Sequence, residues 1–436
     1  MFVAVQPKPR RRWLSFSLRA LLVLMTILCV FLGWIGPRWL EMTREEAAVK
    51  KILEQHGWAH YDYQEEALLS PTPPTPNGPY LLRYLFGDHI FSRVVSVGLR
   101  HQDEQDESTR PNPNQLVSVL PNLKHVRWMW FEHSYPLQEE TLQCLLNYNQ
   151  LETLTLDDSG ISADQLARFA VIDSITHISL TGEDASDAHL AKLSQFPNLK
   201  SLSIDVDVMF NPNSPQHTPV GVRHLGKIAT LESLTLRSLP RNSDEAIAAL
   251  VELKHLKKLD TDEMCGFDSS LTERCLPYVF QIESLEELHM RFKKSNVRFE
   301  PEQYQGLDRL TGLKYLCLEG SNVHDEIMPV IGKLTNLETL NLNRSWVTSE
   351  GVAALTNLKK LKRLGLTDTR FDLEDLPLLD QLDSLEVLAI GLNRGFTDER
   401  LQDAGYIASQ YAFDGWVSLD MTSEKYERVA QQKKSP

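Results

Sequence analysis

The 436-residue chain is poor in the residue groupings that build catalytic or metal sites. Its five cysteines show no paired spacing such as Cys-x-x-Cys, so a zinc site is not expected. Cys265 and Cys275 are near enough in sequence to form a disulfide, but nothing in the sequence requires one. The chain also lacks a G-x-S-x-G elbow, an H-E-x-x-H helix and a glycine-rich dinucleotide turn. These absences argue against an enzyme.

One segment resembles a phosphate-binding loop by letters alone. Gly221 to Lys227 matches G-x-x-x-x-G-K, but Ile228 stands where a magnesium-binding Ser or Thr belongs. The segment aligns instead with the helix that begins near Gly351 in a later repeat. We therefore expect no nucleotide and no other cofactor.

Basic charge is scarce outside the N-terminus. Residues 1–40 contain six basic residues and no acid, whereas the whole chain has a net charge of −14, so residues 41–436 carry −20. A body this acidic repels phosphate backbones, which excludes nucleic acid as an expected partner. The composition, 42% hydrophobic and 24% charged, is that of a folded protein.

Long hydrophobic runs are limited to one, near the N-terminus. Ala20–Ile35 contains sixteen positions without a charge, and residues 18–40 reach the ~20 residues that cross a bilayer. Trp34 and Trp39 occupy positions typical of interfacial aromatics, and the preceding basic cluster predicts a cytoplasmic N-terminus. A cleaved secretory signal is the alternative, but the GPRWLEM sequence after Ile35 offers no small-x-small site. We expect an uncleaved signal anchor with everything after it on the periplasmic or extracytoplasmic side.

The most informative feature is an internal repeat of the pattern L-x-x-L-x-L. We assign twelve copies, which begin at residues 94, 123, 151, 175, 199, 231, 256, 285, 313, 337, 361 and 385. Five of the eleven spacings between starts are 24 residues, and leucine-rich repeats have periods of ~20–29 residues. Between copies lies a polar turn and a short capped helix, as at Ser162 and Gln165, which form a capping-box pattern.

These repeats predict an α/β fold: a leucine-rich-repeat solenoid, or horseshoe, preceded by one transmembrane helix. Alternate strand residues point inward, so stacked strands form a concave parallel β-sheet with short helices on the convex side. Eleven gaps of ~4.8 Å give an inner arc on the order of 50 Å, which suits a protein ligand better than a metabolite.

The expected domain organisation follows from these elements. It comprises a basic cytoplasmic N-terminus (1–17), a transmembrane signal anchor (18–40), a juxtamembrane helix and Pro-rich spacer (41–80), the solenoid of about twelve repeats (81–391), and a C-terminal cap with a polar tail (392–436). Within it, LLRYLFGDHIF is expected to cap the first repeat.

The repeat T/V-x-V-T-D-x-G-L-x-x-L-x-x-L-x-x-L-x-L resembles the leucine-rich repeats abundant in planctomycete bacteria. The opening RRRWLSFSLRALLVLMTILCVFLGWIGPRWL resembles that of membrane-anchored members of this group. The resemblance implies a horseshoe fold and a protein-interaction role, without a characterised activity. The repeats are also similar to those of eukaryotic F-box substrate receptors, but no F-box-like helical module precedes them here.

Residues at the third, fifth and seventh positions of each pattern are expected on the concave face. This candidate binding face consists of His177, Asp205, Arg237, Asp260, Asp262, Glu287, His289, Arg291, Tyr315, Glu319, Asn341 and Arg363. The hypothesis is that the acidic and aromatic subset from Asp260 to Glu319 contacts a partner. The alternative is a solvated polar face of the kind that any repeat protein has.

Two chemical alternatives on this face are not favoured. His289 beside Asp260 and Asp262 suggests a metal cluster, but nearby Arg291 and Lys258 oppose a divalent ion, so we expect none. A lone cysteine in the face, at position 317, lacks an evident base.

The sequence predicts a membrane-anchored interaction module or scaffold that binds a protein or envelope polymer on the non-cytoplasmic side. The alternatives are a passive structural envelope component and, third, a substrate-receptor-like adaptor.

Overall fold

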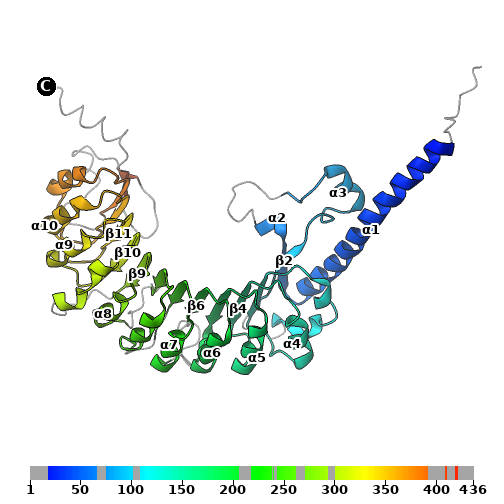
Figure 1. The fold of residues 1–436 in the computed structure, drawn as a ribbon, viewed down its shortest axis with the longest axis horizontal. Helices are drawn as coiled ribbons and strands as arrows, with labels where there is room; N and C mark the ends of the chain where they lie inside the picture. Colours follow the sequence, from blue (N-terminus) through cyan, green and yellow to red (C-terminus); the bar gives the residue numbers. More distant parts are fainter. Residues whose placement is uncertain are drawn as a thin grey trace, which may run out of the picture.

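The repeats stack into an open arc with a long N-terminal helix projecting from one end (Figure 1). The structure, a computed structural model, describes residues 18–65, 75–101, 109–205, 218–237, 239, 243–261, 271–292, 300–390, 408–409 and 418–420. Strands line the inside of the arc and short helices its outside (Figure 1).

All described strands belong to one sheet, ordered β1 to β13, then β15 and β14. The bounds are β1 Gly57–Tyr61, β2 Val94–Leu99, β3 Trp128–Glu132, β4 Thr153–Asp157, β5 His177–Thr181, β6 Ser201–Asp205, β7 Ser233–Leu236, β8 Lys258–Asp260, β9 Glu287–Arg291, β10 Tyr315–Glu319, β11 Thr339–Asn341, β12 Arg363–Gly365, β13 Val387–Ala389, β14 Ala408–Ser409 and β15 Ser418–Asp420. Strands β2 to β13 are parallel, one for each repeat.

The helices are mostly short. The α-helices are α1 Leu18–Glu54, α2 Asp62–Glu65, α3 Tyr80–Phe86, α4 Glu139–Leu145, α5 Ala163–Arg168, α6 Asp187–Lys192, α7 Pro219–Leu225, α8 Leu276–Val279, α9 Met328–Ile331 and α10 Ser349–Val352. The 3-10 helices are η3 Pro113–Leu116, η4 Leu120–Asn122, η5 Phe169–Val171, η6 Gly182–Ala185, η7 Leu193–Gln195, η8 Ala246–Glu252, η9 Glu273–Cys275, η10 Pro301–Tyr304, η11 Leu307–Arg309, η12 Asp325–Ile327, η13 Ala353–Asn357 and η14 Leu373–Gln381. Repeats of 24 residues leave little chain for the convex side, which explains the frequent 3-10 turns.

Strand register confirms that the repeated leucines share one interior. Leu154 on β4 pairs with Ile178 on β5, which pairs with Leu202 on β6, and each is at most 2% exposed. The residues between them are half-buried or exposed and face the concave side, as the period-two pattern predicts. Each repeat therefore buries its apolar residues only against its neighbours.

The frame assigned to the second repeat is wrong. Register places Trp128 opposite Thr153 and Met129 opposite Leu154, so the pattern begins at Val126 rather than three residues earlier. Met129 and the next alternate residue, Phe131, are the buried pair of this strand. Trp128 is half-buried on the concave side instead of lying in the core. Because β3 has hydrophobic residues on both faces, the repeat pattern could be aligned to this sequence in two ways.

Two short C-terminal strands extend the sheet beyond β13. β15 pairs antiparallel with β13 and with β14. The polar tail expected after it lies outside the described residues.

At the N-terminus, α1 continues without interruption into the body of the protein. Its second half buries Ala48 and Ile52 in the main core, and β1 pairs antiparallel with β2 as the first strand of the sheet. The segment expected as a cap, LLRYLFGDHIF, forms α3 and has no buried side chain between Tyr80 and Phe86. The end of the stack is instead covered by α1 and β1, because they supply the apolar residues that reach β2.

Opposite charges alternate along one edge of the concave sheet, at the second position of consecutive repeats. The members of this ladder are Lys200, Glu232, Lys257, Glu286, Lys314, Glu338 and Lys362. The pKa of Glu232 is lowered mainly by a hydrogen bond from the ammonium group of Lys257, and next by one from Lys200. Opposite charges on neighbouring strands attract each other, so the ladder favours the observed stacking of adjacent repeats.

On the convex side, neighbouring repeats are joined by an aspartate that accepts two hydrogen bonds. The backbone N–H and the hydroxyl of a helix-capping threonine donate to the two carboxylate oxygens of an aspartate one repeat earlier. The pairs are Asp187 with Thr218, Asp244 with Thr272, and Asp325 with Thr348, at distances of 2.6–2.8 Å. A Cβ on Gly221 or Gly351 would lie 2.2 Å from the aspartate oxygen, so glycine at that position leaves room for the carboxylate.

We expect Asp325→Ala to lower the free energy of unfolding by about 2 kcal/mol, because two donors on Thr348 lose their acceptor. Asp325→Asn retains one carbonyl acceptor and should lose about half as much. The measurement is the urea midpoint of unfolding. Glu326→Ala, the same kind of truncation at an exposed neighbour, serves as the control. Equal midpoints for Asp325→Ala and Glu326→Ala would remove this contact from the account of stability.

Candidate binding face

The predicted subset between Asp260 and Glu319 comes together on strands β8, β9 and β10. Asp260 pairs with His289, and Glu287 pairs with Tyr315 across the next strand boundary. These side chains project from the concave side of the sheet, at successive outward positions. We call the group Asp260, Glu287, His289, Arg291 and Tyr315 the mid-face patch.

An aromatic stack lies at the centre of the mid-face patch. The rings of His289 and Tyr315 are 3.9 Å apart between centroids and nearly parallel, at 10°. Lys258 Nζ lies 3.3 Å from Glu287 Oε2, and His289 Nε2 lies 3.7 Å from the same oxygen. The patch thus presents a flat aromatic surface flanked by charges of both signs, which suits a protein surface of mixed polarity.

Two residues that the sequence places on this face, Glu319 and Cys317, are buried. Glu319 is only 3% exposed, and its Oε2 lies 3.4 Å from Arg291 Nη2 and 3.5 Å from the amide of Asn341. Cys317 is also buried, at 3% exposure. The outward position of a strand residue therefore did not guarantee exposure, because longer neighbours on adjacent strands cover short or paired side chains.

The remaining predicted residues are spread along the arc. His177 and Arg363 are exposed at the starts of β5 and β12, and Asp205 lies 3.8 Å from Arg237 across β6 and β7. Asn341 is half-buried and accepts from the backbone N–H of residue 343. Asp262 lies outside the described residues, as does Cys265, whereas Cys275 is a buried free thiol. Burial raises the pKa of this thiol well above its usual range.

Sequence reasoning missed an aromatic cluster at the N-terminal end of the face. Trp58 on β1 makes edge contacts with Trp128 and Trp130 on β3, at centroid distances of 6.1 and 6.2 Å. Gly98 on β2 makes this possible, because a Cβ there would lie 2.2 Å from the Trp58 ring. We call Trp58, Trp128 and Trp130 the tryptophan platform. The sequence VRWMWF places Trp128 and Trp130 at outward positions when the repeat pattern begins at Val126. The incorrect start three residues earlier obscured this.

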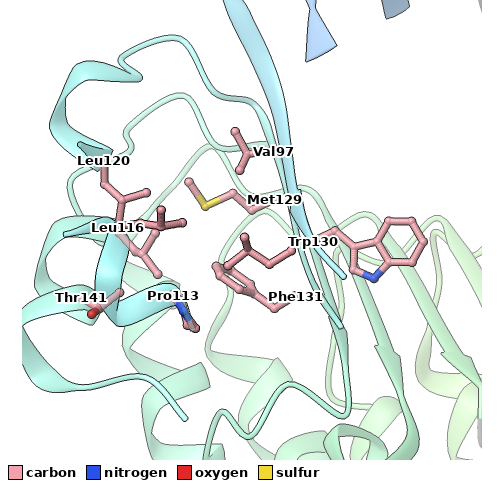
Figure 2. Close-up of a pocket in the computed structure, with 10 residues that line it drawn as sticks. Val97, Pro113, Leu116, Leu120, Met129, Trp130, Phe131 and Thr141 are labelled. Carbon is pink, nitrogen blue, oxygen red and sulfur yellow. The ribbon is translucent and has the colours of Figure 1, made fainter. Parts of the chain in front are cut away.

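The core beside the platform contains a small apolar cavity between the sheet and the first convex turns. Val97, Leu116, Leu120, Met129 and Phe131 are among its lining residues (Figure 2). Figure 2 also shows the ring of Trp130 on the opposite side of β3 from the cavity. At a cavity volume of about 10 Å³, the space holds no more than one water molecule, so it is a packing defect rather than a ligand site.

One group among the described residues has the ligand types of a metal site. Ligand atoms of His133, Asp157 and Asp158 lie within 4.8 Å of one another at the carboxyl ends of β3 and β4. His133 Nδ1 lies 3.7 Å from Asp158 Oδ2, while Asp158 Oδ1 accepts from the backbone N–H of Glu183. The sequence did not reveal this group, because its members meet only through strand register. Because Asp158 is already engaged by His133 and by the backbone of Glu183, we assign no metal here.

The comparisons with known proteins found matches among solved structures. No family model and no curated protein matches it. Among solved structures, it is similar to an internalin of Listeria monocytogenes, with 13% identity, a TM-score of 0.40, and coverage of 70% of this chain and 87% of that one. It is also similar to a leucine-rich-repeat protein of Leptospira interrogans, with 18% identity, a TM-score of 0.34, and coverage of 65% and 83%.

The fold is a leucine-rich-repeat solenoid. The parallel strands β2 to β13 and the shared leucine interior decide this. With TM-scores of 0.40 and 0.34, the two solved structures add nothing to this assignment.

Proposed function

We propose that this leucine-rich-repeat protein is a membrane-anchored binding module whose concave face recognises a protein outside the cytoplasm. The observation that supports this most is the pair of aromatic sites on the concave face, the tryptophan platform and the mid-face patch. Tryptophan, tyrosine and arginine dominate the energetics of protein interfaces, and these side chains are only half-buried.

The separation of the two sites favours a macromolecular ligand. From β3 to β9 there are six strand gaps, which span on the order of 30 Å at ~4.8 Å each. A metabolite cannot touch both sites at once, whereas a protein surface can. An envelope polymer is the second candidate from sequence, but the mixed charges of the mid-face patch favour a protein.

The proposed anchor is the first half of α1. Its best 18-residue window has a mean hydropathy of 2.4, and only 6% of that window is buried in the protein. Leu21, Leu24 and Leu28 are 45–56% exposed, which is unfavourable in water and favourable in lipid. Because α1 runs unbroken from this apolar half to Ile52 in the core, the structure supports an uncleaved anchor over a removed signal.

The basic residues before the apolar segment support an N-terminus in the cytoplasm. In spheroplasts, whose cytoplasmic membrane is exposed, added protease should therefore digest the solenoid and leave a short anchor fragment. Protease added to sealed inside-out vesicles should leave the solenoid intact. The reverse pattern of protection would overturn the proposed topology.

A photo-cross-linking experiment tests the binding role in the native membrane. We expect Ser179→p-benzoylphenylalanine, on the concave side of β5, to give one discrete protein adduct on irradiation. Val220→p-benzoylphenylalanine, on α7 at the convex side and 51% exposed, is the matched control and should give none. Equal, diffuse adducts at both positions would instead support a passive envelope component.

A further inference from the structure

Helix α3 exposes an apolar surface that the solenoid does not cover. Tyr80, Leu81, Tyr84 and Leu85 are 74, 65, 75 and 60% exposed, and no residue of α3 is buried. Four large apolar or aromatic side chains on seven residues form a contiguous patch, because positions three and four apart share a helix face. In a water-exposed element this patch would lower solubility without contributing to the core.

This helix is held beside the apolar half of α1 (Figure 1). Phe86, its last residue, lies 6.1 Å from Phe31 between ring centroids, and Phe91 lies 6.0 Å from Trp34. Ile35 and Ile90 are buried between the two segments, in a small hydrophobic cluster separate from the main core. The segment from α3 to residue 91 therefore attaches to the part of α1 that is apolar enough to enter a bilayer.

The position along α1 fixes the depth of α3. Arg38 ends the apolar run, and its guanidinium lies 4.5 Å from the Trp34 ring, an arrangement suited to the headgroup level. Phe31 lies seven residues before Arg38, which is about 10 Å deeper at 1.5 Å per residue. Interfacial helices bury their apolar faces about 5–10 Å into the boundary between headgroups and acyl chains. With Arg38 at the headgroup level, Phe86, beside Phe31, would lie at that depth.

We infer that α3 is a second membrane contact, whose Tyr80, Leu81, Tyr84 and Leu85 enter the outer leaflet beside the α1 anchor. The inference rests on the proposed anchoring of α1. Tyrosines are typical of this level, since the ring is apolar and the hydroxyl reaches water. Arg38 on α1 and Arg83 on α3, both half-buried, add positive charge that would attract anionic headgroups.

A second contact has a mechanical consequence. A single helix in a bilayer leaves the attached solenoid free to rotate about the helix axis. Two contacts, joined by the buried Ile35 and Ile90, restrict that rotation and fix which side of the arc faces away from the membrane. The concave face would then be presented to partners in one orientation.

Lipid photo-cross-linking of the full chain tests this inference. The protein is reconstituted into nanodiscs of phosphatidylcholine and phosphatidylglycerol, with p-benzoylphenylalanine replacing Leu85 on α3, Leu24 on α1 or Val220 on the convex side. We expect lipid adducts at Leu85 and Leu24 to exceed those at Val220 by about tenfold, because only the first two reach acyl chains. Mass spectrometry of the irradiated protein measures the yield.

The three positions separate the two possible failures. Adducts at Leu24 but background yield at Leu85 would overturn the α3 contact while leaving the anchor in place. Background yield at Leu24 would overturn the anchor and with it the inference. Leu85 is exposed, so its substitution removes no core contact, and an unchanged urea midpoint verifies folding for each variant. As a second measurement, Leu81→Asp should reduce the adduct yield at Leu85 about threefold or more, whereas Val220→Asp should not.

Discussion

Replacing Glu45 by Gln is expected to stabilise the protein at pH 8 and to change its stability little at pH 5. Glu45 lies on α1 where the helix meets β2, and it is only 3% exposed. The backbone N–H of Val94 donates to its carboxylate, while Oε2 has no hydrogen-bond partner among the described residues. Burial raises the pKa of Glu45 from 4.5 to about 7, and the positive charge of Arg93 offsets only part of this.

The sign of the pH effect follows from that raised pKa. The folded state binds the proton more tightly than the unfolded state. The buried side chain therefore lowers the free energy of unfolding least when it is protonated. Below pH 4.5 both states are protonated and Glu45 adds no penalty. Between pH 4.5 and 7 the penalty grows, and above pH 7 it is constant at about 3–4 kcal/mol. A neutral Gln avoids this penalty at every pH.

The measurement is the difference in urea midpoint between Glu45→Gln and the unsubstituted protein at pH 5 and pH 8. Glu46→Gln is the matched control, because it makes the same change at the adjacent, exposed position. It should shift the midpoint by a similar, small amount at both pH values. An equal stabilisation by Glu45→Gln at pH 5 and pH 8 would show that its charge is not the cause.

The spacing of the leucines was enough to predict the solenoid, because each repeat carries its own strand pattern and its own turn. The parallel order β2 to β13 then follows from stacking repeats in sequence order. The second repeat shows where this local reasoning ends. LKHVRW and VRWMWF both fit the pattern, and only pairing of Met129 with Leu154 decides between them.

Features that depend on contacts between distant segments were beyond the sequence. The pattern placed Glu319 on the correct side of β10, but its burial depends on Arg291 from the preceding strand. In the same way, the role inferred for the exposed face of α3 depends on the contact between Phe86 and Phe31 of α1. These two residues are 55 positions apart in the sequence. Position within the repeat predicts direction, whereas exposure and site geometry come from neighbouring strands and helices.

The tryptophan platform gives the largest expected effect on binding. We expect Trp130→Ala to weaken partner binding by about 10- to 100-fold, since large half-buried aromatics are the side chains that most often dominate interfaces. Tyr315→Ala in the mid-face patch should weaken it to a similar extent if one partner spans both sites. The readout is the concentration of partner, once identified from the Ser179 adduct, that gives half-maximal cross-linking.

Controls for this last experiment come from the same fold. Val171→Ala truncates a convex side chain that is 69% exposed and should leave binding unchanged. Trp130→Phe keeps a ring beside Trp58 and should retain most of the affinity that Trp130→Ala loses. If the aromatic ring did not contribute to binding, both variants would bind equally well. Because Trp130 points away from the core, its loss should shift the urea midpoint little (Figure 2). If Trp130→Ala and Tyr315→Ala both bind as tightly as Val171→Ala, the concave face is not the binding surface, and recognition must use another side of the solenoid.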